Sequence, residues 1–241
     1  SIGNRIESRG EEDFNAGEDL PGLDLTQHGG ALKAQYKLLK DALTLEFLFA
    51  FATGDRSAGW GVRPFLGDGE RRIGSVWDGF QGGNDSITNF RFNPAFNFDM
   101  ILWRQLVGTL TDGLVFRPSA QYNLTEELGA RLDVIYSRAM FASSTPSGSL
   151  AVPLQGGADL GSPDANLGVE FNLKVFFDSD DGFHTWFQYG ALVAMDGLAR
   201  LVQDDDATGE GAGTVDGSTQ AVRRLDAGVA HTLQLFLGIT F

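Results

Sequence analysis

The sequence contains no cysteine and only 7 prolines among its 241 residues. Without cysteine the chain has no disulfide framework and no thiolate metal site, and the redox compartment stays undetermined. It also lacks any run of 18 apolar residues, which excludes a transmembrane helix but not a membrane barrel. In contrast, 32 glycines and 11% aromatic residues favour a protein of many strands and turns.

Basic residues are scarce as well, with 18 Lys and Arg against 32 Asp and Glu and a formal net charge of -14. No basic patch points to nucleic acid, so we expect no nucleic-acid partner. Residues 1–30, 54–112, 142–165 and 197–222 together hold -12 of this charge. The strands predicted below are therefore nearly neutral, with mixed charge on their polar face, as a hydrated lumen requires.

Apolar and polar residues alternate along seven segments. In 42–53, for example, Leu45 and Phe47 alternate with Thr44 and Glu46. This alternation predicts strands at 31–40, 42–53, 114–124, 128–141, 165–177, 183–195 and about 223–241. Several exceed a dozen residues, whereas strands of globular sheets have roughly 5–6. Such lengths are sufficient to cross a bilayer at a tilt of about 45°.

The connections between these segments fall into two classes. Lys40-Asp41, 125–127 and 178–182 are tight, whereas 54–112, 142–164 and 197–222 are long. Short periplasmic turns that alternate with long extracellular loops are typical of outer-membrane barrels. A soluble sandwich or lipocalin-like barrel remains the alternative, since alternating strands also form its walls. We favour an all-β, antiparallel transmembrane β-barrel.

This interpretation divides the chain into an extracellular loop (1–30), a β-hairpin (31–53), a long extracellular or plug loop (54–112) and the remaining strands (113–241). In 96–108, apolar residues recur at helical spacing, which predicts a short helix inside the long loop. The loop carries six arginines and no lysine, which suits fixed pairing with carboxylates. We expect these arginines to form a constriction: Arg56, Arg63, Arg71, Arg72, Arg91 and Arg104.

The polar face of the predicted strands supplies the candidate pore-lining residues. They are Lys33, Lys37, Glu46, Arg117, Gln121, Arg131, Asp133, Glu170, Lys174, Gln188, Arg224 and Asp226. The chain ends in HTLQLFLGITF, with alternate apolar residues counted back from a C-terminal aromatic. This pattern resembles the signal by which the barrel assembly machinery recognises its substrates. Its residues are Leu233, Leu235, Leu237, Ile239 and Phe241.

Three further stretches carry a second resemblance, namely ATGDRSAGWGVRPF, DMILWRQLVGTLTDG and VFRPSAQYNLTEELGARLDVIYSRA. Over about residues 50–140 and the closing strand, the chain resembles an outer-membrane β-barrel family of myxobacteria and related deltaproteobacteria, distantly similar to alginate-export porins. The resemblance implies the fold and the outer-membrane location. In alginate exporters an arginine-rich lumen guides an anionic polysaccharide, but here acids offset the basic lumen residues, so the substrate is not carried over.

No catalytic or metal site emerges from the sequence. Asp180 or Asp181 with His184 lies at the tight-turn end, where barrel enzymes seldom work. In DDDATGEG, Val215 stands where a calcium loop needs its bidentate glutamate, which leaves a solvated acidic loop bridged loosely to lipopolysaccharide. We expect no enzyme and no cofactor. The expected function is a channel that passes solutes or polymers across the bacterial outer membrane; a barrel that anchors a surface or periplasmic assembly is the alternative.

Strand parity gives a last expectation. Bacterial single-chain barrels have an even number of antiparallel strands, and the sequence predicts seven. The opening SIGNRIESRGEEDFN also lacks the apolar centre of a secretory signal. We therefore expect the chain to be the C-terminal part of a larger barrel, or a wall that a second chain completes, with an open edge at 31–39. The alternative is an eighth strand within 1–30 or 96–108, which would allow a closed barrel.

Overall fold

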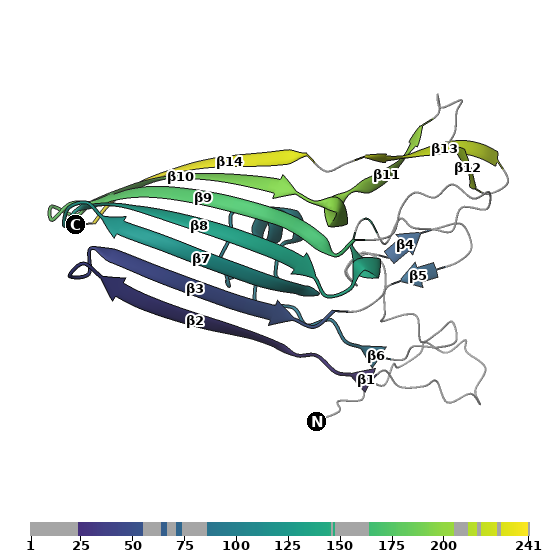
Figure 1. Cartoon of the computed structure of the whole chain (residues 1–241), viewed down its shortest axis with the longest axis horizontal. Helices are drawn as coiled ribbons and strands as arrows, with labels where there is room; N and C mark the ends of the chain where they lie inside the picture. Colours follow the sequence, from purple (N-terminus) through teal and green to yellow (C-terminus); the bar gives the residue numbers. More distant parts are fainter. Residues whose placement is uncertain are drawn as a thin grey trace.

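A computed structural model of the chain describes residues 24–54, 64–66, 71–73, 86–145, 147, 164–204, 212–215, 218–225 and 228–240. Its main element is a seven-stranded antiparallel meander in the order β14-β10-β9-β8-β7-β3-β2 (Figure 1). The strands are β2 (Gly29–Leu38), β3 (Leu43–Ala52), β7 (Gly113–Asn123), β8 (Leu128–Ala139), β9 (Asn166–Asp178), β10 (Phe183–Ala194) and β14 (Val229–Ile239). All seven strands predicted from alternation are thus present, in the expected order.

The sheet is open. Among the described residues, β14 pairs only with β10, and β2 pairs only with β3. The seven strands therefore do not close into a barrel by themselves. The sequence predicted a closed barrel only for the complete wall, of which this chain would be a part. The expected open edge at β2 is present. Because the sheet has seven strands, each antiparallel to its neighbours, the two edge strands β2 and β14 run in the same direction (Figure 1).

The connections lie as predicted. Residues 39–42, 124–127 and 179–182 form tight turns at one end of the sheet, and the long connections leave from the other end (Figure 1). In the first turn, Leu39, Lys40 and Asp41 all have positive φ, between 53° and 71°. Short and long connections thus alternate strictly along the meander.

The long connections and the residues before β2 contain short elements that alternation did not predict. Residues 24–87 include β1 (Asp24–Leu25), which pairs with β6 (Ser86–Ile87), and β4 (Pro64–Leu66), which pairs with β5 (Arg71–Ile73). A separate sheet joins β11 (Arg200–Asp204), β13 (Ser218–Leu225) and β12 (Ala212–Val215). Single 3-10 turns follow β8 and β10 as η3 (Ala142–Ser144) and η4 (Asp196–Leu198).

The last strand of the main sheet is shorter than expected. It begins at Val229, whereas the sequence analysis began it at about Arg223. Residues 223–225, which the prediction included, belong instead to β13, which pairs with β11 and β12. The prediction was wrong here because alternation marks a strand without identifying the sheet to which it belongs.

The two faces of the main sheet differ in chemistry. One face carries Glu46 and its cross-strand neighbours Gln35 and Ser119, and we call it the inner face. The outer face carries large apolar side chains that remain exposed, from Leu32 and Phe47 across to Leu233 and Leu237. Leu237, for example, is 64% exposed. Such a large apolar surface is rare on soluble monomers.

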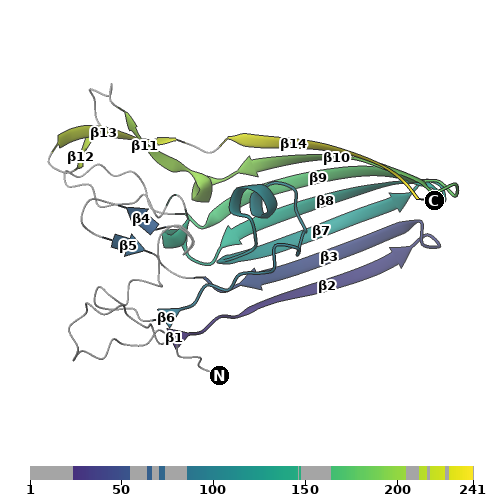
Figure 2. The same cartoon turned by 180° about the vertical axis from the view of Figure 1, so that it is seen from behind.

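Residues 89–112, here named the inner segment, cover part of the inner face. Its π-helical turn η2 (Leu102–Val107) lies over β8 and β9 (Figure 2). The turn ends at Gly108, whose φ of 92° suits glycine. The short helix predicted at 96–108 is therefore confirmed. No helix among the described residues is long and apolar enough to cross a membrane.

The hydrophobic core lies between the inner segment and the sheet. The segment contributes buried Met100, Ile101, Leu102 and Trp103, and the sheet contributes mainly Leu48, Ala50, Ala52, Val115, Ile135 and Leu192. These sheet residues belong to the half of the inner face that lies towards the long connections. The half towards the tight turns carries the other charged residues of the inner face, and Glu170 is the charged residue of the apolar half. The inner face is therefore divided into a covered apolar half and a polar half.

Candidate functional site

The inner segment is a loop whose two ends pair with each other. The N–H of Phe92 donates to the carbonyl of Leu110 at 3.0 Å, and Arg91 forms an antiparallel bridge with Thr111. Thr109 also donates its hydroxyl to the carbonyl of Phe92 at 2.6 Å. These contacts form the neck of the loop. Its tip, residues 97–104, reaches the middle of the sheet.

Glu170 on β9 holds the tip. Its carboxylate accepts four N–H contacts: Oε1 from Met100 at 2.6 Å and Ile101 at 3.1 Å, and Oε2 from Ile101 at 3.2 Å and Leu102 at 3.1 Å. The residue is only 1% exposed. A buried carboxylate is costly unless donors surround it, and here backbone amides supply them. Neither of its lateral neighbours, Ile135 and Leu192, could do so.

A second buried carboxylate lies beside the first. Asp99 accepts the N–H of Trp103 at 2.6 Å and is 6% exposed. Burial and, secondarily, the negative charge of Glu170 raise the pKa of Asp99 from its ordinary 3.8 to about 7, against the opposing effect of the Trp103 and Arg104 amides. Asp99 is thus the acid of the tip that changes charge near neutral pH.

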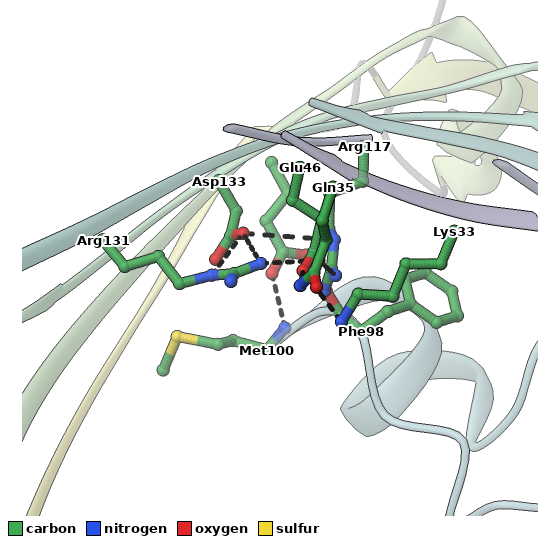
Figure 3. A network of polar contacts seen from close by, with 9 residues as sticks. Lys33, Gln35, Glu46, Phe98, Met100, Arg117, Arg131 and Asp133 are labelled. Atoms are coloured by element: carbon green, nitrogen blue, oxygen red, sulfur yellow. Dashed lines mark hydrogen bonds and ion pairs between the residues drawn. The ribbon is translucent and has the colours of Figure 1, made fainter. Parts of the chain in front are cut away.

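Glu46 on β3 joins four strands in the polar half of the inner face. Its carboxylate accepts hydrogen bonds from Gln35 on β2 at 2.6 Å, from Arg131 on β8 at 2.9 Å and from Arg117 on β7 (Figure 3). The Nζ atom of Lys33 lies 2.8 Å from Oε2 of Glu46, the oxygen that also accepts the hydrogen bond from Gln35. Since the Glu46 side chain is only 1% exposed, this ionic network is little screened by water.

Asp133, also on β8, belongs to the same network. Arg131 donates to it from Nε at 2.9 Å, and its Nη2 lies 2.8 Å from the same oxygen. Arg117 in turn donates to the carbonyl of Phe98 at 2.9 Å, so the network also contacts the tip of the inner segment (Figure 3). Charged groups of the sheet thus fix the tip from two sides.

A cavity of about 480 Å³ lies between the tip and the polar half of the inner face. Its wall is largely polar, with a platform formed by Trp186 and Phe176, over which the ammonium of Lys174 lies at 5.2 and 5.8 Å. It is lined by Asn97, Phe98, Asp99, Arg104, Arg117, Gln121, Arg131, Asp133, Asn172, Lys174, Phe176, Asp178, Trp186 and Gln188. Such a space admits water and small polar solutes.

The structure places ten of the twelve predicted pore-lining residues on the inner face. Six of them line the cavity: Arg117, Gln121, Arg131, Asp133, Lys174 and Gln188. Lys33 and Glu46 belong to the ionic network, Lys37 lies near the first tight turn, and Glu170 binds the tip. Arg224 is in β13 and therefore outside the main sheet, which corrects its assignment. Asp226 is outside the described residues.

The predicted constriction arginines are only partly described. Arg91 lies in the neck and Arg104 in the tip, and both side chains are exposed. Within the described residues, neither forms an ion pair. Arg71 and Arg72 are in β5, and Arg56 and Arg63 are outside the described residues. The contacts that fix the described part of the loop instead join its backbone to Glu170 and Arg117 of the sheet.

The alternate residues of the closing strand share the outer face. Leu233, Leu235, Leu237 and Ile239 are all more than half exposed. Phe241, the last residue of the predicted assembly signal, lies outside the described residues. His231 is on the same face, where its Nδ1 lies 2.7 Å from the hydroxyl of Tyr189.

The polar groups that the tip brings to the site were not predicted from the sequence, because Asp99 and Asn97 lie in a loop, where no strand alternation marks them. A signal did exist for the covered half: Leu48, Ala50 and Ala52 follow Glu46 on the same face. An apolar stretch on an otherwise polar face indicates that something packs there.

The described residues contain no group of three or more His, Cys, Asp or Glu side chains that could hold a metal ion. Comparison with known proteins adds no assignment, because no protein-family model and no curated protein matches the chain.

Proposed function

We propose that the chain forms part of the wall of a β-barrel channel in the bacterial outer membrane, which passes polar solutes or polymers. One observation carries the proposal: the outer face exposes large apolar side chains along every strand of the main sheet, while the inner face holds buried ionic groups. A soluble sandwich would bury the apolar face and expose the polar one. In lipid the same arrangement satisfies both faces.

Strand length and connections support the same proposal. The seven strands have 10 to 13 residues, and about 9–11 residues suffice to cross a bilayer. Their tight turns all lie at one end, which in outer-membrane barrels is the periplasmic end. The proposed partners are accordingly outer-membrane lipid, lipopolysaccharide and the barrel assembly machinery.

The open edges require further strands, because an unpaired edge in lipid leaves backbone groups without partners. A second copy of the sheet in the same orientation cannot supply them, since β2 and β14 run in the same direction and would meet in parallel. We propose that an odd number of further antiparallel strands completes the wall.

Conductance tests the channel. The protein purified from outer membranes and reconstituted in planar bilayers should give discrete current steps. A variant with Gln121 and Gln188 both changed to Trp, which narrows the cavity from opposite sides, should reduce these steps. The matched control places Trp at Leu132 and Phe187 on the outer face. Silent bilayers that contain correctly folded protein would contradict the channel.

The alternative is a barrel that serves as anchor or scaffold for a surface or periplasmic assembly. The inner segment favours it, because the covered half of the inner face leaves less open lumen. An anchor should give no current and should copurify with a stoichiometric partner from native membranes. Current without such a partner would favour the channel.

A further inference from the structure

We propose that Glu170 is a positioning residue that latches the tip of the inner segment in the lumen, and that release of this latch widens the path past the cavity. The inference rests on the proposed channel for its effect on current, but the latch itself is a contact of the folded chain. Its evidence is the set of four N–H contacts to one buried carboxylate.

Within the described part of the chain, Glu170 has hydrogen-bond donors for its carboxylate only when the tip is docked. In the sheet register, Glu170 lies between Ile135 and Leu192, in the apolar half of the inner face. No Lys, Arg or His of the described residues forms an ion pair with it. The backbone of residues 100–102 is therefore its complement. Charge-assisted hydrogen bonds of this kind are roughly twice as strong as neutral ones.

The tip and the neck have separate attachments. The neck is closed by backbone pairing between Phe92 and Leu110, far in sequence from Glu170. The tip depends on Glu170, on the Arg117 contact to Phe98 and on the Trp103 contact to Ser137. Loss of the latch should thus free the tip while the neck stays closed.

Apolar burial decides how large the effect can be. Met100, Ile101, Leu102 and Trp103 are each 1–3% exposed, so their burial keeps the docked tip dominant even without the latch. A latch variant should therefore open more often, rather than stay open. The suitable readout is the frequency of opening, which a reactive group on a buried position of the tip reports.

The chain has no cysteine, so a single Leu102→Cys substitution gives such a reporter. Leu102 is 1% exposed, and a thiol there should react with a charged maleimide only when the tip undocks. In the folded protein in detergent, adding Glu170→Gln should raise the modification rate at least about tenfold. Glu126→Gln, in an exposed tight turn, is the matched control and should leave the rate unchanged.

A tether provides the reverse experiment. A Cβ built on Gly190 would lie 3.2 Å from Cβ of Met100, close to the 3.5–4.5 Å of disulfides. In a protein with Met100→Cys, Gly190→Cys and Glu170→Gln, oxidation should return the current to the wild-type level, and reduction should raise it again. An equal current in the oxidised and reduced protein would contradict the proposal that release of the tip widens the path past the cavity.

The two arms separate the latch from the channel. An unchanged thiol rate in Glu170→Gln overturns the latch whether or not the protein conducts, whereas a raised rate in a silent protein leaves the latch and contradicts the channel. If Glu170→Gln does not fold, Glu170→Asp keeps the charge but withdraws it by one methylene. Glu170→Asp should also raise the rate of thiol modification at Leu102→Cys, and an unchanged rate in this variant would likewise overturn the latch.

Discussion

The indole N–H of Trp103 donates to the hydroxyl of Ser137 at 3.0 Å, which connects the helical turn of the inner segment to the central strand β8. Trp103 is 1% exposed and Ser137 2%. Neither group has access to water in this position, so each depends on the other.

Ser137→Ala should therefore destabilise the protein by about 1–3 kcal/mol, because it leaves a buried N–H without an acceptor. Ser119→Ala is the matched control: Ser119 is also buried on the inner face, but its hydroxyl has no partner among the described residues. Its removal should change the free energy of unfolding by less than about 0.5 kcal/mol. Denaturant titration in detergent, followed by tryptophan fluorescence, measures both. Equal effects would contradict the assignment.

The Glu46 network predicts a larger effect. Glu46→Gln removes the negative charge that the guanidinium groups of Arg117 and Arg131 share. Because breaking a buried ion pair is strongly destabilising, the free energy of unfolding should fall by about 3–5 kcal/mol. The exposed Lys37–Asp41 pair, with its charged atoms 3.9 Å apart, is the control. Asp41→Asn should cost less than about 1 kcal/mol. Unfolding free energies at low and high salt measure the difference, and a small Glu46→Gln effect at low salt would refute a structural role.

Asp99 predicts a pH dependence. Its pKa is raised from 3.8 to about 7, so the folded state holds its proton more tightly, and stability falls as the pH rises from about 4 to about 7. The charged groups around it are Glu170 on β9, Arg104 on its own segment, and the cavity residues Arg117, Arg131, Asp133, Lys174 and Asp178. From pH 5 to 8 the loss through Asp99 should be roughly 2 kcal/mol.

Asp99→Asn removes this titration and keeps the size of the side chain. Its unfolding free energy should fall less than that of the wild type between pH 5 and 8. Asp180→Asn, at an exposed position in a tight turn outside the cavity, is the matched control and should follow the wild-type curve. Identical slopes in the wild type and Asp99→Asn would show that Asp99 already carries its charge at pH 5.

The two faces of the main sheet should differ in how well they tolerate a charged residue. With the outer face against lipid, as proposed, Leu237→Asp should reduce the amount of protein in the outer membrane, because a charge on the lipid face of a barrel is destabilising. Gln234→Asp, on the inner face of the same strand, is the control and should insert normally. Quantitative blotting with heat-modifiable gel migration measures both, and equal abundance would contradict a lipid-facing outer surface.

Completion of the wall can be tested by cross-linking in a chain without native cysteine. Tyr36→Cys on β2, combined in turn with Leu233→Cys, Leu235→Cys and Leu237→Cys on β14, should give no disulfide within or between chains in native membranes. Tyr36→Cys with Leu45→Cys joins direct cross-strand partners and should cross-link. A disulfide between β2 and β14 would show that the sheet closes on itself or on its own copy.

Much of the main sheet could be predicted from the sequence, because alternation is a local property. The pattern of Ala42–Thr53 and the tight turn before it were sufficient to place β3 beside β2. The position of 96–108 could be predicted only as a helix in a loop. Its docking depends on Glu170, which is far along the chain and alternates on the polar face like Lys174. Alternation does not distinguish a carboxylate that meets water from one that meets backbone amides.

The placement of the inner segment between β3 and β7 sets an order of assembly. Every neighbour in the main sheet is also the next main strand in sequence, so each hairpin can form as soon as its two strands are present. The tip is the exception. It is synthesised before β7, yet its anchor Glu170 and its partner Ser137 lie on β9 and β8. The tip can therefore dock only after the later strands β7, β8 and β9 have paired, so its docking is a late step of folding.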